Sequence, residues 1–315
     1  MGRQSVVRTA DCRLSLPERR KRMDKILSKK KYIALFVGPA FLMYLLFGLI
    51  PILYNLYLSL FKTNLLGDST FVGLKNYIHL FQDQFFRQAV ANNLKFVLGS
   101  YAAHMLLALL LSNILFQKIK GSRLFQSVYF MPSVICGTAI GMLWTFIYHP
   151  DFGLVNGFLK AVGLESSVRI WLADEKTVIP ALIVVTMWQF VGYHMVIQLA
   201  GMKNIDAALY EAASIDGASR WQQFTRITFP LMKPILKIDS VLIVTGSLKL
   251  YDLVAVTTSG GPNHASEVLS TYMFTQGFKA LKFGYSSTIA TMLLVLCIGA
   301  TLIINLVFSG KKTDY

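Results

Sequence analysis

Six long apolar runs dominate the sequence and limit what it can fold into. A hydrocarbon core about 30 Å thick needs roughly 20 helical residues to cross it. In lipid every backbone polar group must be satisfied within its own segment, so apolar runs of this length form helices. The composition agrees, because 54% of the 315 residues are hydrophobic and 15% are charged. We therefore predict an all-α membrane protein with six transmembrane helices, at about 32–57, 94–116, 124–148, 178–199, 235–257 and 288–308.

The first run predicts a retained membrane anchor. It is longer than the apolar part of a secretory signal peptide, and no cleavage pattern of small residues follows it. We therefore divide the chain into a basic N-terminal tail at 1–31, a six-helix domain at 32–310 and a short tail at 311–315.

Basic residues gather in alternate segments between the predicted spans. The segments 1–31, 117–123, 201–237 and 311–315 together carry more than twice as many Lys and Arg residues as the segments on the other side. Because positive loops stay in the cytoplasm, both termini and the loop at 201–234 are predicted to be cytoplasmic. The net charge of +15 is thus explained by membrane topology, and a nucleic-acid partner is not expected.

No catalytic or metal-binding pattern is present in the sequence. The three cysteines lie far apart without CxxC spacing, and the five histidines form no ligand pattern with them. The chain contains no GxxxxGK[ST] phosphate loop, no GxSxG motif and no HExxH motif. We expect a non-enzymatic chain with no catalytic residues, no metal and no cofactor of its own.

The loop at 201–234 has the signals of a folded helical hairpin. Asp206 can cap a first helix, and Gly217 can supply the left-handed residue that commonly ends one. Ser219 and Gln222 have capping-box spacing, so a second helix is predicted from Arg220 until Pro230 removes a backbone donor.

The first helix of this hairpin presents a surface suited to a protein partner. Leu209, Ala212 and Ala213 are small or apolar, and Glu211 lies beside them. Small side chains let a partner approach the backbone closely, and a carboxylate can pair with an arginine. The loop therefore predicts a docking element.

These residues resemble a known family motif. The hairpin matches the EAA motif of permease subunits from binding-protein-dependent ABC importers at Glu211-Ala212-Ala213, Asp216-Gly217-Ala218, Phe224, Ile227, Pro230 and Pro234. Residues 71–77, Tyr251-Asp252 and residues 258–262 match the sugar-importer permeases of the maltose MalF and glycerol-phosphate type. The resemblance covers about residues 32–308. It departs at Asp206, where many relatives have proline, although both residues suit a helix start.

The resemblance implies a type I ABC importer permease fold in a bacterial inner membrane. Its implied partners are a second, homologous permease in a heterodimer, two ATPase subunits, an extracytoplasmic solute-binding protein and a carbohydrate, either a di- or an oligosaccharide. ATP and Mg²⁺ would bind the partner ATPase. The residues implied to couple to that ATPase are Leu209, Tyr210, Glu211, Ala212, Ala213, Ile215, Asp216 and Gly217.

Polar residues inside the fourth and fifth spans predict a substrate path, because such groups are costly in lipid and usually face a cavity. The candidates are Trp188, Gln189, Tyr193, Ser247, Lys249, Tyr251 and Asp252. In the maltose importer the equivalent helices line the sugar pocket, and the resemblance aligns Tyr193 with a pocket tyrosine. Lys249 and Asp252 have an alternative interpretation as an internal ion pair. His104 and His194 are expected to bond across helices.

Two other classes of membrane protein remain as alternatives. An ion-coupled secondary transporter predicts discontinuous helices and several buried carboxylates, whereas only Asp252 is expected as a buried acid here. An intramembrane enzyme needs a clustered catalytic set, and the sequence shows none.

Overall fold

The computed structural model describes residues 30–64, 67, 69–117 and 119–309, and these belong to two compact units, Met1–Tyr57 and Leu58–Tyr315. The tail predicted at 311–315 and nearly all of the tail predicted at 1–31 lie outside the described residues.

The first unit is helical wherever it is described. Its described residues form α2 (Lys30–Tyr44), the π-helical turn η1 (Leu45–Leu49) and all but the last residue of α3 (Ile50–Leu58). Proline lacks the N–H that a regular helix would need at position 51, and the turn before it widens so that the Ile50 N–H bonds the Leu45 carbonyl. Ala34–Leu58 is long and apolar enough to cross a membrane, as predicted for 32–57.

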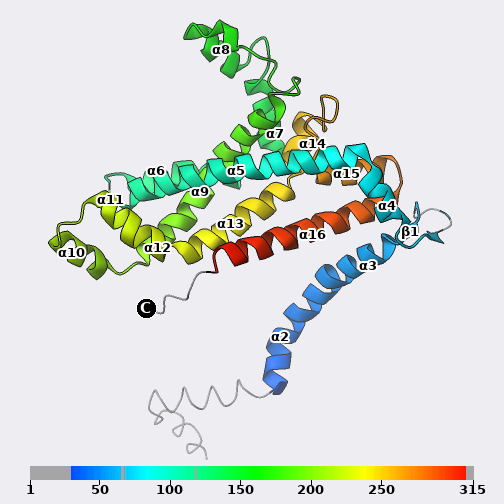
Figure 1. Ribbon diagram of the computed structural model, residues 1–315, viewed down its shortest axis with the longest axis horizontal. Helices are drawn as coiled ribbons and strands as arrows, with labels where there is room; N and C mark the ends of the chain where they lie inside the picture. Colours follow the sequence, from blue (N-terminus) through cyan, green and yellow to red (C-terminus); the bar gives the residue numbers. More distant parts are fainter. Residues whose placement is uncertain (1–29, 65–66, 68, 118, 310–315) are drawn as a thin grey trace, which may run out of the picture. The chain divides into compact units, whose positions relative to one another are not determined.

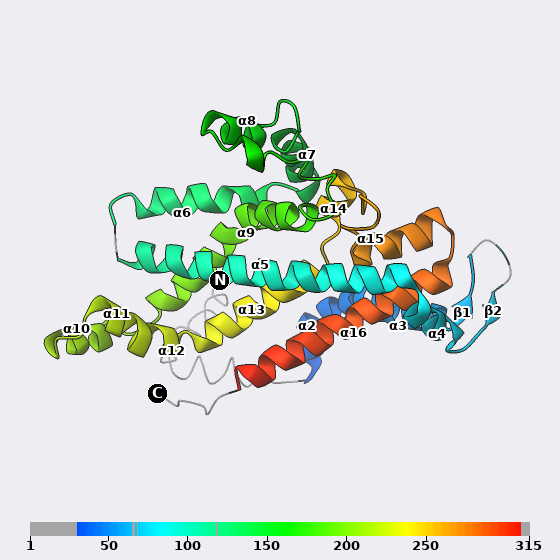
Figure 2. The same ribbon diagram turned by 45° about the horizontal axis from the view of Figure 1, so that its top comes forward.

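Four long helices form the body of the second unit (Figures 1 and 2). They are α5 (Gln84–Phe116), α9 (Val178–Lys203), α13 (Lys233–Leu248) and α16 (Phe283–Val307). α5 packs along α9 and α13, and α13 also packs on α16. Residues of α5 are buried at helical spacing, as Phe96, Ser100, His104 and Ala108 show, so one face of α5 meets its neighbours.

The start of α5 is fixed by a carboxylate. Oδ1 of Asp83 accepts from the Phe85 and Phe86 amides at 2.9 and 3.4 Å, and Oδ2 accepts from the hydroxyls of Tyr272 and Tyr285. Burial alone would raise the pKa of Asp83, but these donors outweigh burial and hold the pKa below its usual value. This cap explains why α5 begins well before the predicted span start at 94.

The third predicted span is not one continuous helix. It consists of α6 (Ser122–Phe130), the 3-10 turn η2 (Met131–Val134) and α7 (Gly137–Ile147), and the two halves are bent by 98°. Proline at position 132 lacks an N–H, and Cys136 is extended with ψ of 145°. The described residues thus include five helices long and apolar enough to span a membrane, or six if this bent pair is one span.

The fifth predicted span is also interrupted. α13 ends at Leu248, and α14 (Asp252–Thr257) begins after a break. The carbonyls of Leu248 and Leu250 at this break accept from the side chains of Asn93 and Ser270, the first at 3.2 Å. A break at membrane depth needs such partners, because no water is available there.

Shorter elements connect the long helices. They are β1 (Phe61–Lys62), which pairs antiparallel with β2 (Thr70–Phe71), then α4 (Lys75–Gln82), α8 (Leu154–Ala161), η3 (Glu165–Ser167), α15 (Leu269–Phe274) and the π turn η5 (Thr275–Lys279). The loop at 201–234 lies at one end of α5, and α4 with the β-ribbon lies at the other (Figures 1 and 2).

Candidate functional site

The loop at 201–234 folds into the predicted hairpin. It contains α10 (Ala207–Ile215), α11 (Arg220–Gln223), the π turn η4 (Phe224–Thr228) and α12 (Phe229–Leu231). Asp206 accepts from the Ala208 amide at 3.0 Å, and Gly217 is left-handed with φ of 77°. The Ser219 and Gln222 capping box forms in both directions, at 2.7 and 3.3 Å. The helix starts, the caps and the glycine turn predicted from the sequence are therefore confirmed.

Most of the predicted coupling residues lie on the exposed surface of α10 and its turn. Leu209, Glu211, Ala212, Ile215, Asp216 and Gly217 are exposed, and Ala213 is half-buried. The Ile215 side chain is 87% exposed, which is unusual for a large apolar residue and marks a surface suited to a partner. Tyr210 differs, because its hydroxyl bonds Thr228 at 2.9 Å and its ring packs on Phe116. Tyr210 thus holds the hairpin together.

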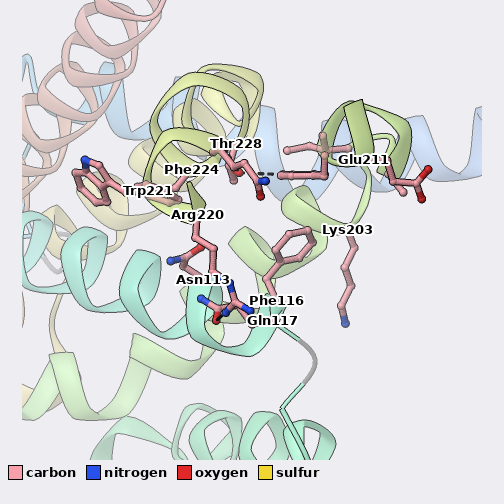
Figure 3. A pocket seen from close by; sticks show the side chains of 13 residues that line it. Asn113, Phe116, Gln117, Lys203, Glu211, Arg220, Trp221, Phe224 and Thr228 are labelled. Atoms are coloured by element: carbon pink, nitrogen blue, oxygen red, sulfur yellow. Dashed lines mark hydrogen bonds between the residues drawn. The ribbon is translucent and has the colours of Figure 1, made fainter. Parts of the chain in front are cut away.

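A hollow of about 700 Å³ lies behind α10, between the hairpin and the ends of α5 and α9 (Figure 3). Arg220 of α11 donates a hydrogen bond to Gln117, which directly follows α5. Phe116 and Lys203 come from the ends of α5 and α9, whereas Glu211 comes from α10 (Figure 3).

An apolar cluster joins the hairpin to the long helices. Met202 of α9, Met232 and Leu236 are buried together, with Phe224 of η4 and Phe308 beside α16 packed against them. The hairpin is therefore packed against the long helices. The cluster contains no residue of α10, which is joined to the rest of the hairpin and to α5 through Tyr210.

A second pocket, of about 440 Å³, lies between the broken α6–α7 segment, α9 and α13. Six of the seven predicted path residues line it, namely Gln189, Tyr193, Ser247, Lys249, Tyr251 and Asp252. Trp188 is not among the lining residues; its ring meets Trp144 edge to face at 5.7 Å. Gln189 also donates to the Ile135 carbonyl at 3.2 Å, which satisfies the backbone where the third span is broken.

The two charged residues of this pocket are not paired with each other. Lys249 and Asp252 are both exposed, and among the described residues no carboxylate lies within 4.0 Å of the Lys249 ammonium. The helix break between α13 and α14 separates them, so the i, i+3 pairing that a continuous helix would allow does not form. The alternative of an internal ion pair is therefore wrong in this structure.

Asp239 of α13 is a buried acid that the sequence analysis did not identify. It is 0% exposed, whereas Asp252, which was expected to be buried, is exposed. Its two oxygens accept from His194 Nδ1 and Gln198 Nε2 of α9, each at 2.7 Å. The spacing of His194 and Gln198, four residues apart on one helix face, is the signal that could have indicated a shared polar partner.

His104 and His194 bond across helices, as predicted. His104 Nε2 contacts the Thr186 carbonyl of α9 at 3.1 Å, and His194 bonds Asp239 of α13. Within the described residues no group of three or more His, Cys, Asp or Glu side chains is arranged to hold a metal ion.

Comparison with known families identifies the chain. The family described as "Binding-protein-dependent transport system inner membrane component" matches residues 95–312, which is more than half of the sequence. The chain belongs to this permease family. The match spans α5 to α16 and therefore includes both the hairpin and the pocket.

Several curated permeases are similar over most of their length. The permease is 40% identical to the probable ABC transporter permease protein YurN of Bacillus subtilis, over 89% of this chain and 97% of YurN. It is 33% identical to the lactose transport system permease protein LacF of Rhizobium radiobacter, over 83% and 89% of the two chains. It is 28% identical to the trehalose/maltose transport system permease protein MalF of Thermococcus litoralis, over 89% and 96%.

The fold of the permease also matches a solved transporter. A chain in the crystal structure of a bacterial ABC transporter involved in the import of the acidic polysaccharide alginate superimposes with a TM-score of 0.79. The match covers 93% of this permease and 100% of that chain at 23% sequence identity. The type I ABC importer permease fold is therefore established for this chain.

Proposed function

We propose that this permease forms half of the translocation path of an ATP-driven carbohydrate importer, and that its hairpin couples the path to a separate ATPase. One observation carries the proposal: the hairpin and the pocket are built on the same two helices. α9 leads from the pocket residue Tyr193 into the hairpin, and α13 leads from the hairpin back to Ser247 and Lys249.

The exposed surface of α10 supports docking to an ATPase. The chain has no phosphate loop, so energy from ATP must come from another subunit, which would bind ATP and Mg²⁺. Ile215 and Leu209 offer exposed apolar contacts, and the Glu211 carboxylate can pair with a basic residue of that subunit. Closure of the ATPase around nucleotide would then move α10 and rock α9 and α13.

The chemistry of the pocket suits a sugar. Tyr193 and Tyr251 offer aromatic faces for the apolar side of a sugar ring. Gln189, Ser247, Lys249 and Asp252 offer donors and acceptors for hydroxyl groups. The names of similar permeases point the same way, since they include lactose, trehalose/maltose and starch degradation products. A di- or oligosaccharide is the proposed substrate.

The proposed complex contains a second, homologous permease, two ATPase subunits and an extracytoplasmic solute-binding protein. A binding protein is supported by the family description and by the solved alginate transporter in complex with its pentasaccharide-bound periplasmic protein. We further propose that the complex lies in the bacterial inner membrane with both termini and the hairpin in the cytoplasm. The Lys and Arg residues of the loop at 201–237 and of the turn after α5 support this orientation.

The test of this proposal is reconstitution of the complete transporter in proteoliposomes. Lactose, maltose, trehalose and maltotriose are supplied one at a time with the binding protein, and ATP hydrolysis and sugar uptake are measured together. We expect at least one of these sugars to stimulate both. Uptake driven by an ion gradient without ATP would contradict the proposal and favour a secondary transporter.

A variant of the docking surface tests the role of the hairpin. Glu211→Ala should lower sugar-stimulated ATP hydrolysis by about fivefold or more. Fivefold is about the smallest change that coupling between two sites typically produces. Glu165→Ala removes an exposed glutamate from η3, far from the hairpin in the chain, and serves as the matched control. Equal activity of the two variants in assembled complexes would argue against coupling through Glu211.

A further inference from the structure

A buried polar cluster joins α9 to α13 inside the membrane domain. Asp239 of α13 accepts from His194 Nδ1 and from Gln198 Nε2 of α9, and its own side chain is fully buried. The His194 ring also meets the His104 ring of α5 edge to face at 5.0 Å. Three helices therefore meet at this cluster.

Such a cluster constrains the helices that carry it. A carboxylate removed from water is tolerated only when its oxygens have hydrogen-bond partners, and both oxygens of Asp239 have one from α9. Rotation or sliding of α9 against α13 would break these bonds and leave the fully buried carboxylate of Asp239 without partners. The two helices are therefore held in one relative position at this level.

The cluster begins at the pocket and extends toward the hairpin, because His194 lines the pocket whereas Gln198 and Asp239 do not. On α9, Gln198 lies between the pocket residue Tyr193 and the hairpin end at Lys203. On α13, Asp239 lies between the hairpin end at Lys233 and the pocket residue Gly246. A movement transmitted along α9 or α13 from the hairpin to the pocket therefore reaches Gln198 or Asp239 on the way.

We propose that Asp239 is a positioning residue for transport: by holding His194 and Gln198, it makes α9 and α13 move as one unit, so that movement of the hairpin reaches the pocket. This proposal rests on the proposed coupling of the hairpin to an ATPase. It assigns Asp239 no contact with the substrate.

The decisive variant replaces Asp239 and both of its hydrogen-bond partners by apolar side chains. Replacing one member would leave the others buried and unpaired, which is strongly destabilising. The triple variant His194→Phe, Gln198→Leu and Asp239→Leu leaves no charge behind, and replacements of this kind are often neutral or stabilising. It retains packing but removes the hydrogen bonds between α9 and α13.

Asp239→Asn is the conservative variant. Its Oδ1 can still accept from His194, and its Nδ2 can donate to Gln198 Oε1, a buried atom that has no partner among the described residues. Ser240→Ala is the matched control, because Ser240 is equally buried on α13 but bonds Tyr101 and the Leu236 carbonyl instead of the cluster.

A cysteine at position 246 reports the state of the pocket without an identified substrate. Gly246 lines the pocket, and a Cβ added there meets nothing within 4 Å. Gly246→Cys is introduced after Cys12, Cys136 and Cys297 are replaced by serine. The rate of its modification by a small maleimide is measured in the assembled transporter with the binding protein, without nucleotide and with ATP plus vanadate.

In the parent complex we expect nucleotide to change the labelling rate by about fivefold or more, and Asp239→Asn and Ser240→Ala should preserve that change. In the triple variant, assembled with its ATPase, the change should fall below about twofold. A full nucleotide response in the triple variant, or its loss in Asp239→Asn, would overturn the role of Asp239. If the parent complex itself shows no response, the proposed coupling fails instead.

Discussion

The hairpin and the pocket differ in what holds them in shape. The hairpin is built from contacts between residues close in sequence, such as the caps at Asp206 and Ser219 and the left-handed turn at Gly217. The pocket is built where helices break, and its broken ends are satisfied by side chains far away in the sequence, such as Gln189 and Asn93. The proposed docking surface and the proposed translocation path therefore rest on different kinds of interaction.

The largest expected loss of transport comes from a substitution in the hairpin. Gly217→Pro forces φ to about −65° at a residue whose φ is 77°, so the turn between α10 and α11 cannot form. We expect ATP-driven uptake of the stimulating sugar to fall by about 100-fold in proteoliposomes.

Gly163→Pro is the control for that change, because Gly163 has φ of 78° but follows α8, on another part of the chain. Its ATP-driven uptake should remain within about threefold of the parent value. Similar losses in both variants would show that the turn at 217 has no special role.

The second effect concerns the pocket. Tyr193→Ala removes an aromatic face from the lining and should raise the sugar concentration for half-maximal uptake about tenfold, with ATPase attachment unchanged. Trp188→Ala removes a larger ring from the same helix that does not line the pocket, and a change below about threefold is expected. A larger effect at Trp188 than at Tyr193 would show that the path runs elsewhere.

The hairpin could be predicted from the sequence in detail, and the pocket only in outline. Caps and the glycine turn are local signals, so Asp206, Gly217 and Ser219 were sufficient to place both helix starts and the end of the first helix. The π turn η4 was not predicted, and Pro230, which was expected to end the second helix, lies inside α12. Six of the seven path residues predicted from the fourth and fifth spans line the pocket, but they make up less than half of its lining. Their pairing depends on packing between distant segments, and the sequence therefore missed both the break after Leu248 and the burial of Asp239.

A third, smaller effect tests whether the charges of the pocket act independently. Without an ion pair, the effects of Lys249→Met and Asp252→Asn on the free energy of unfolding should add to within about 0.5 kcal/mol in the double variant. Thermal unfolding of the purified permease without sugar measures this cycle. A coupling energy well above that value would mean that the two side chains pair in the membrane.

The smallest expected effect on transport comes from a substitution at the end of α5 that lies opposite the hairpin. Asp83→Ala removes the helix cap and the acceptor of two tyrosine hydroxyls, and should cost about 1–2 kcal/mol of stability. Sugar-stimulated ATP hydrolysis of the folded complex should not change. Loss of hydrolysis at unchanged stability would contradict a purely structural role.

The lowered pKa of Asp83 also fixes the pH dependence of this stability difference. Its stabilisation is fully present above the unfolded value of about 3.9 and is lost as the pH falls through the lower folded pKa. The difference in thermal midpoint between parent and Asp83→Ala should stay constant from about pH 8 to pH 5 and shrink only below about pH 4.

The central claim is that an ATPase subunit binds the exposed face of α10. A photo-crosslinking amino acid at position 215, where the native isoleucine is 87% exposed, tests this claim directly in membranes containing the whole transporter. The same amino acid at position 164, an exposed leucine before η3, is the control. We predict a covalent product with the ATPase subunit from position 215 and none from position 164; no product from position 215 in an actively transporting complex would contradict the account.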